Sequence, residues 1–254
     1  MISTTSLKTR AIQLARILFL ILLYLGIWWL LSIVVGSSLL LPSPIETAES
    51  LWRVVSDPLC MRDLGYTFLR LIAGYCIGAV FGVVLAVLTA KVPFLHYIFS
   101  PFRLLIKSTP VMSFVLLLLV SVVSGWVPIV VSAIMVAPML WSTTEQSILS
   151  LDPKLTEMGK LYFPLFKRIR LVYLPQMMPQ ILAAAVTALG FAWKSVITAE
   201  VLSLPRFAIG NRMYLSKIYL ETADMIAWTI LVVTLSLLME VLLKKLLEKR
   251  GERK

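Results

Sequence analysis

Four ionisable side chains lie inside long apolar stretches of the sequence, where a charge needs either a partner or a watery pathway. On insertion scales, an ionisable group near the centre of a bilayer costs roughly 2.5–3.5 kcal/mol. Such groups therefore indicate an ion pair within a membrane or the path of a charged solute. The four residues are Arg70, Lys194, Glu200 and Glu240.

Lys194 is the deepest of the four, near the middle of its apolar stretch and beside Trp193. Two interpretations stay open. As residues of a translocation pathway, Lys194 and Trp193 would meet an anionic solute. As a structural residue, Lys194 would pair with a carboxylate or a carbonyl group of another helix.

The other three charges have simpler interpretations. Arg70 and Glu200 fall toward the same side of their stretches, which favours a structural ion pair, although both are also candidates for the pathway. Glu240 precedes Lys244 by four residues, the order that favours a pair on one helix face.

Other kinds of chemistry have little support in the sequence. His96 is the single histidine, and neither Cys60 nor Cys76 stands at metal-ligand spacing from it, so no metal site is expected. The sequence has no phosphate-binding loop, so this chain is not expected to hydrolyse ATP or to bind another cofactor. A membrane-embedded enzyme would need paired carboxylates, a histidine cluster or a nucleophile with a base, and the scattered acids offer none of these.

The composition identifies the setting of these side chains. Of 254 residues, 59% are hydrophobic and 15% are charged, and the mean hydropathy is +0.92. Soluble domains are about 45–50% apolar and about 25% charged. The net charge of +11 sits at the ends of apolar runs, which fits membrane topology and not nucleic-acid binding. The sequence therefore predicts an integral membrane protein.

Six apolar runs are candidates to cross a bilayer as helices. They predict an all-α protein with a single transmembrane domain, residues 1–254. An amphipathic helix is expected at 44–56 in the outer interface, and the longest cytoplasmic loop at 145–175. The first run is too long for the core of a cleaved signal peptide, which favours a retained helix. The predicted spans are residues 17–35, 66–90, 108–124, 127–143, 178–202 and 225–243.

The distribution of lysines and arginines predicts the orientation of these spans. With the amino terminus in the cytoplasm, seventeen of the 24 basic residues fall in cytoplasmic segments and five in outer loops. This is the positive-inside bias of membrane proteins. We therefore expect both termini in the cytoplasm.

The loop at 145–175 combines a helix start with exposed apolar residues. Asp152 is a good N-cap, Pro153 suits the first helical position and Glu157 adds negative charge near the helix N-terminus. A contiguous apolar patch on a cytoplasmic loop is typical of a protein interface, and a helix lying on the membrane surface is the alternative. The apolar residues that follow the helix start are Leu161, Tyr162, Phe163, Leu165 and Phe166.

This loop resembles the EAA coupling motif of ABC-importer permeases, which leads to a Leu-Pro at the start of a span. Three further segments resemble the nitrate, sulfonate and taurine-type permeases: the run after the first span, the start of the second span and part of the fifth. The motifs read Asp152-Pro153-Lys154-Leu155-Thr156-Glu157-Met158-Gly159, Leu41-Pro42-Ser43-Pro44, Thr67-Phe68-Leu69-Arg70-Leu71-Ile72-Ala73-Gly74, and Ala192-Trp193-Lys194 through Ala199-Glu200.

The resemblance implies a type I (MetI-like) ABC importer transmembrane domain in the inner membrane of a bacterium. Two copies, as a homodimer, would form the pathway for a small solute of the sulfonate, nitrate, taurine or vitamin-precursor type. An external binding protein would deliver the solute, and two cytosolic ATPase subunits, which carry ATP and Mg²⁺, would drive its transport.

The resemblance also implies which residues couple the permease to its ATPase. Glu157 and Gly159 would act at that contact, the glycine by permitting close approach, and Leu174-Pro175 would end the coupling segment and start the fifth span. The full implied set is Asp152, Glu157, Met158, Gly159, Tyr162, Phe163, Leu174 and Pro175.

The motif departs from the family at Phe163, which stands where a glycine is usual, and Pro164 is expected to supply the bend instead. A channel or secondary transporter that works without an ATPase is the alternative function. Such proteins often show two matching hydrophobic halves with broken helices, which the sequence does not display.

Overall fold

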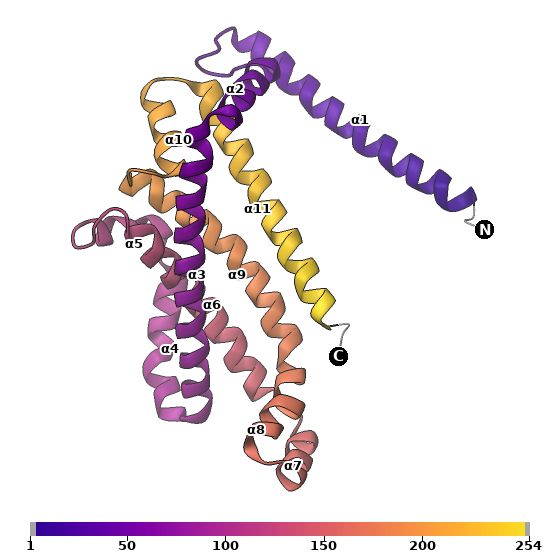
Figure 1. Ribbon diagram of the computed structural model, residues 1–254, viewed down its shortest axis with the longest axis vertical. Coiled ribbons are helices and arrows are strands. Elements are labelled where there is room, and N and C mark those ends of the chain that lie inside the picture. The colour runs from indigo at the N-terminus through magenta and orange to yellow at the C-terminus, as the bar shows by residue number, and fades with distance from the viewer. Residues whose placement is uncertain (1–3, 252–254) are drawn as a thin grey trace. The chain divides into compact units, whose positions relative to one another are not determined.

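A computed structural model of the chain describes residues 4–251, with the side chains of residues 4–11, 14 and 246–251 left out. All regular secondary structure in this described part is helical, which confirms the all-α prediction (Figure 1). The helices are α1 (Thr4–Val35), α2 (Pro44–Ser56), α3 (Pro58–Lys91), α4 (Pro93–Ser108), α5 (Val111–Leu119), α6 (Val127–Leu149), α7 (Pro153–Tyr162), α8 (Leu165–Arg168), a π-helix η1 (Ile169–Tyr173), α9 (Leu174–Ser203), α10 (Ile209–Ile218) and α11 (Thr222–Gly251).

The chain divides into two compact units. The first unit consists of the chain up to Pro58 together with Met213–Leu231. The second consists of Leu59–Arg212 and the chain from Val232 onward. The side chains of Lys8, Arg10 and the last basic residues of the tail, on which the predicted orientation partly depends, lie outside the described residues.

In the first unit, α2 matches the amphipathic helix predicted at 44–56. Ser43 caps it: the Ser43 Oγ accepts from Glu46 N at 3.2 Å, and the Glu46 Oε2 accepts from Ser43 N at 2.8 Å. This reciprocal capping box, with Pro44 at the first turn, explains why the Leu-Pro-Ser-Pro run begins a helix.

The turn between α1 and α2 is held by side chains of α1. Trp28 Nε1 donates to Pro42 O and Ser32 Oγ donates to Leu41 O, both at 3.1 Å. Along α1 itself most apolar side chains are exposed, as expected of a helix surrounded by lipid.

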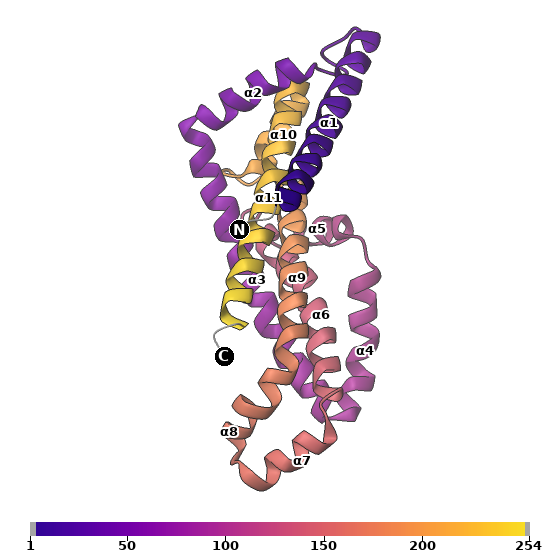
Figure 2. The ribbon, with the colours of Figure 1, turned by 90° about the vertical axis from the view of Figure 1, so that its right-hand side faces the viewer.

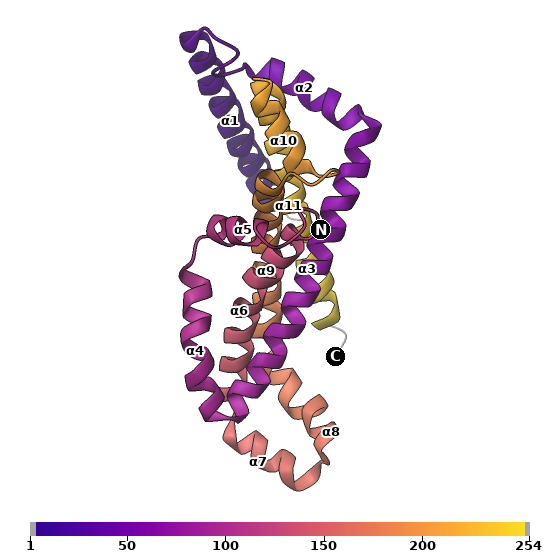
Figure 3. The same cartoon turned by 90° about the vertical axis from the view of Figure 1, so that its left-hand side faces the viewer.

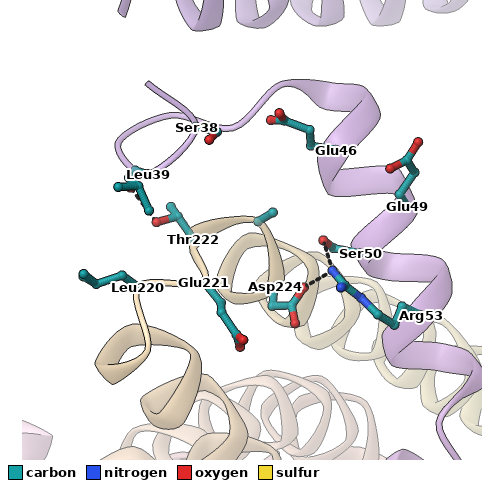
Figure 4. A pocket seen from close by; sticks show the side chains of 11 residues that line it. Ser38, Leu39, Glu46, Glu49, Ser50, Arg53, Leu220, Glu221, Thr222 and Asp224 are labelled. Atoms are coloured by element: carbon teal, nitrogen blue, oxygen red, sulfur yellow. Dashed lines mark hydrogen bonds and ion pairs between the residues drawn. The ribbon is translucent and has the colours of Figure 1, made fainter. Parts of the chain in front are cut away.

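The same unit holds a cavity of about 520 Å³ bordered by α2 and by residues 220–224. Figure 4 shows Arg53 reaching between Ser50 and Asp224 at its edge, and the Arg53 Nη2 lies 2.8 Å from the Asp224 Oδ1. Thr222 Oγ1 donates to Leu39 O at 2.6 Å. These contacts join the α1–α2 segment to residues 213–231 within the unit.

Five helices of the described residues are long and apolar enough to cross a membrane, and α4 with α5 supplies a sixth only if that pair, bent by 98°, counts as one span. The run expected to span at 108–124 is thus broken at Pro110, between α4 and α5. Pro110 has no N–H and drives Thr109 out of the helical region, so it ends α4 instead of kinking a longer helix. Figure 3 shows α5 turning away from the end of α4.

Two basic residues of α4, Arg103 and Lys107, turn toward α6. Arg103 pairs with Glu145 and lies 5.0 Å from the centre of the Trp141 ring, and Lys107 Nζ donates to Ser142 Oγ at 2.8 Å. The Arg103 charge is thus paired with a carboxylate, and the Lys107 ammonium group has a hydroxyl acceptor.

In the second unit, α3 and α6 pack with their backbones in direct contact along a row of glycines. A Cβ built on Gly74, Gly78 or Gly82 would lie only 2.5–2.6 Å from a carbonyl oxygen of α6. Small residues at every fourth position let membrane helices approach closely. On its other side α6 packs along α9, and apolar residues of α5, α6 and α9 form a buried cluster: Val115, Val127, Val131, Met135 and Ala199.

Gly78→Val is expected to destabilise the protein, because its side chain would meet Ala133 O and Val136 Cβ. Overpacking of this kind costs about 1–3 kcal/mol. Gly65→Val on the same helix is the matched control, since nothing lies within 4 Å of a Cβ built there. Thermal unfolding of both variants in detergent checks the prediction, and equal melting temperatures would contradict the close α3–α6 contact.

Candidate functional site

The segment between α6 and α9 forms a compact turn of its own. Figure 2 shows α7 and α8 joining the ends of α6 and α9. The Gln176 side chain closes this turn: its Oε1 accepts from Asp152 N at 3.0 Å, and its Nε2 donates to Val172 O at 2.8 Å. The start of α7 is thereby fixed to the start of α9.

The start of α7 is as predicted. Asp152 is the N-cap, and its Oδ1 accepts from Lys154 N at 2.8 Å, with Pro153 in the first turn. Glu157 and Met158 are exposed on the following turn and so remain available to a partner.

Gly159 packs inside the turn. It is buried, and a Cβ built on it would lie 3.1 Å from the Val172 Cγ2 and 3.3 Å from the Arg168 Cγ. Within the chain, this glycine therefore permits a close approach of α7 to α8 and η1.

The bend after α7 falls at Phe163 and Pro164. Phe163 has extended backbone angles (φ −129°, ψ 136°), because a residue before proline is disfavoured in the helical region, and α8 begins after Pro164. Pro164 thus supplies the bend, as expected. Phe163 itself is half-buried.

Leu174 and Pro175 start α9 as predicted, but they do not interrupt the chain's helical path. The helical path is continuous over Leu165–Ser203. The π-helix η1 directly precedes them, and Leu174 N bonds to Ile169 O, five residues back. A wider turn of this kind accommodates a proline that lacks an N–H and would crowd an ordinary helix.

The outer surface of this turn is apolar. Leu161 is 82% exposed, Tyr162 74%, Leu165 62% and Phe166 77%. We call these four residues the coupling surface. Lysines and arginines surround it, namely Lys160, Lys167 and Arg170. An exposed apolar patch with a charged rim has the character of a protein-binding surface.

The predicted Arg70–Glu200 ion pair is present and buried. Arg70 Nη1 lies 2.8 Å from Glu200 Oε1, and the two side chains are only 12% and 0% exposed. Glu200 Oε2 also accepts from Thr67 Oγ1 at 3.0 Å and from Gly210 N at 3.2 Å. Arg70 donates to Phe207 O at 2.6 Å. The pair therefore fastens the turn between α9 and α10 to α3.

A second cluster beside this pair was missed in the sequence. Asp63 is 2% exposed and accepts from Arg212 Nε at 2.7 Å and from Arg62 at 3.2 Å. Asp63, Thr67 and Arg70 recur at intervals of four and three residues, which places them on one face of α3. This spacing is visible in the sequence, but Asp63 precedes the span predicted at residues 66–90.

A third charged cluster joins α4 to α6 near the coupling segment. Glu145 is 3% exposed; it pairs with Arg103, and its Oε1 lies 2.9 Å from His96 Nδ1. His96 lies on α4 and contributes to this helix contact.

One face of α9 stays open along several turns. We define the α9 stripe as Ala183, Thr187, Phe191, Lys194 and Thr198, all exposed and at helical spacing. Lys194 belongs to this stripe, but Trp193 does not: it is 1% exposed, and its Nε1 donates to Val232 O at 3.0 Å. The structure therefore separates the two neighbours predicted to act together.

A family model described as binding-protein-dependent transport system inner membrane component matches residues 78–251. The chain belongs to this family. It is thus an inner-membrane, multi-pass permease of the ABC-importer class, a transport component and not an enzyme.

Two solved structures share the fold of this permease. One is the crystal structure of an amino acid ABC transporter with histidines, with a TM-score of 0.60 and 19% identity, covering 78% of this chain and 94% of that one. The other shows inward-facing conformations of the MetNI methionine ABC transporter, with a TM-score of 0.58 and 19% identity, covering 80% and 94%. No curated protein matches the permease sequence.

Proposed function

We propose that the permease is one of two copies in an ATP-driven importer, and that the coupling surface binds a cytosolic ATPase subunit. The observation that carries this proposal is the exposure of Leu161, Tyr162, Leu165 and Phe166 on a folded turn between two spans. Four large apolar side chains in water are unfavourable, and a groove on a partner would cover them.

The turn is built to transmit motion. Its helical path continues from Leu165 into α9, and α9 packs along α6, which leads into α7. The Gln176 bonds and the contact between Gly159 and Val172 keep α7 fixed to this unit. A partner that shifts the turn would therefore move both spans together. Glu157, Met158 and Asp152 lie at the exposed start of α7 and are proposed to contribute to this contact, with Phe163, Leu174 and Pro175 setting its geometry.

The α9 stripe is proposed to line the pathway shared by two copies. Apart from Phe191, its residues are small or polar and include one lysine, which suits a watery path better than contact with lipid. The lysine favours an anionic solute, in line with the sequence resemblance to nitrate, sulfonate and taurine-type permeases. On this proposal an external binding protein delivers the solute and both termini face the cytoplasm.

Reconstitution tests the proposal. The permease, expressed together with its proposed ATPase and binding-protein partners, is expected to co-purify with the ATPase and to take up solute into liposomes only with ATP and Mg²⁺. An ATPase unable to hydrolyse ATP is the control. Uptake that proceeds equally with that control would favour the channel or secondary-transporter alternative.

Gly159→Val is expected to uncouple the permease without preventing its insertion. The added methyl groups would press on Val172 and shift α7, at a cost of about 1–3 kcal/mol for overpacking. Solute taken up per ATP hydrolysed should fall. Adding Val172→Ala removes the two nearest methyl groups and should restore much of the ratio. Failure of this rescue would mean that Gly159 acts through another contact.

A further inference from the structure

Gly190 on α9 leaves a space that the Glu240 side chain of α11 fills. Gly190 is buried, and a Cβ built on it would collide with Glu240 Oε1 and lie 3.2 Å from Glu240 Cδ. Because Gly190 is near the middle of α9, this carboxylate lies within the membrane-spanning region. None of the ion pairs found among the described side chains includes Glu240.

Lys194 stands one helical turn further along α9. Four residues advance an α-helix by about 6 Å and rotate it by about 40°, so Lys194 emerges beside the position where Glu240 lies. Lys194 is exposed, and in the described part of the chain its ammonium group has no ion-pair partner. The Lys194 side chain thus leaves α9 one turn beyond Gly190, against which the Glu240 carboxylate lies.

The contact between these parts of α9 and α11 is fixed independently. Trp193 is 1% exposed, and its Nε1 donates to Val232 O at 3.0 Å. Trp193 lies beside Lys194, and Val232 lies on α11 two turns before Glu240. This bond holds α9 against α11 beside Lys194 and two turns from Glu240.

We propose that Glu240 is the counter-ion of Lys194, held at the edge of the α9 stripe by the space at Gly190. The pair is open in the conformation described, where Lys194 faces the stripe, and it closes when the stripe is no longer hydrated, because an unpaired charge in a dry membrane is costly. Glu240 is thus a positioning residue for Lys194. This inference rests on the proposed function, in which the α9 stripe lines the solute pathway.

A double-mutant cycle tests the pair. Lys194→Gln and Glu240→Gln are each expected to lower ATP-driven uptake by about tenfold, and the double variant to lower it no further, because contacting residues are strongly non-additive. The melting temperatures of the four proteins should follow the same pattern. Losses that multiply in the double variant would overturn the proposal.

Gly190→Ala gives a second measurement that needs no change of charge. Its methyl group would push the Glu240 carboxylate off α9, so uptake should fall as in Glu240→Gln, and combining the two substitutions should add little. Gly65→Ala, where the added Cβ meets nothing within 4 Å, is the matched control. Unchanged uptake in Gly190→Ala would overturn the proposal even if a charge variant failed to fold.

These results separate the pair from the proposed function. If the unsubstituted permease shows no ATP-dependent uptake, the proposed function fails. If it transports normally and Lys194 and Glu240 behave independently, only the counter-ion inference fails.

Discussion

Glu200→Gln is expected to destabilise the permease strongly. The substitution keeps the shape of the side chain but leaves Arg70, which is 12% exposed, without its carboxylate. Removing one partner of a buried ion pair costs about 3–5 kcal/mol, because the other charge stays buried and uncompensated. Thermal or denaturant unfolding of the purified permease measures the change.

Two further variants show whether the loss comes from the buried pair. Replacing both partners, as in Arg70→Met with Glu200→Gln, should cost less than Glu200→Gln alone, since no uncompensated charge remains. Arg53→Ala breaks an ion pair whose arginine is 71% exposed, and exposed pairs contribute about 0–1 kcal/mol. A Glu200→Gln loss as small as that of Arg53→Ala would contradict the structural role assigned to the pair.

Replacing Tyr162 and Phe166 together with alanine is expected to release the ATPase. Both rings are more than 70% exposed on the coupling surface, and aromatic anchors of an interface often contribute 2 kcal/mol or more each. Co-purification of the ATPase should be lost and ATP-driven uptake with it, while the melting temperature of the isolated permease changes little.

The matched control removes equally exposed aromatic groups from the other side of the membrane. Trp52 is 76% exposed and Tyr219 is 69% exposed, and the proposed orientation places both outside the cell. Alanine at these two positions should leave the ATPase bound. Release of the ATPase by both pairs alike would indicate a general loss of folding instead of a specific contact.

Much of the fold follows from local sequence. The Ser43–Glu46 capping box and the Asp152-Pro153 start depend on residues within one or two turns, so their types and spacing predict helix starts that the structure confirms. The Arg70–Glu200 pair was also predictable, because two opposite charges on the same side of their spans have few other partners.

The features that were missed depend on residues far apart in the sequence. The pairing of Arg103 was not predictable, because its partner, Glu145, is 42 residues away. The packing of Gly159 against Val172 was not predictable either, because Val172 comes from the other side of the turn. The contact between Gly190 and Glu240 was likewise not predictable, because it depends on how α11 packs against α9.

The most direct test of the central claim is cross-linking from the coupling surface in native membranes. A photo-reactive amino acid is placed at Leu161, which is 82% exposed, and at Trp52 as the control. The account predicts that the Leu161 probe forms an adduct with the ATPase subunit and that the Trp52 probe does not. An adduct with lipid alone at Leu161, or labelling of that position by a reagent confined to the outside of the cell, would contradict it.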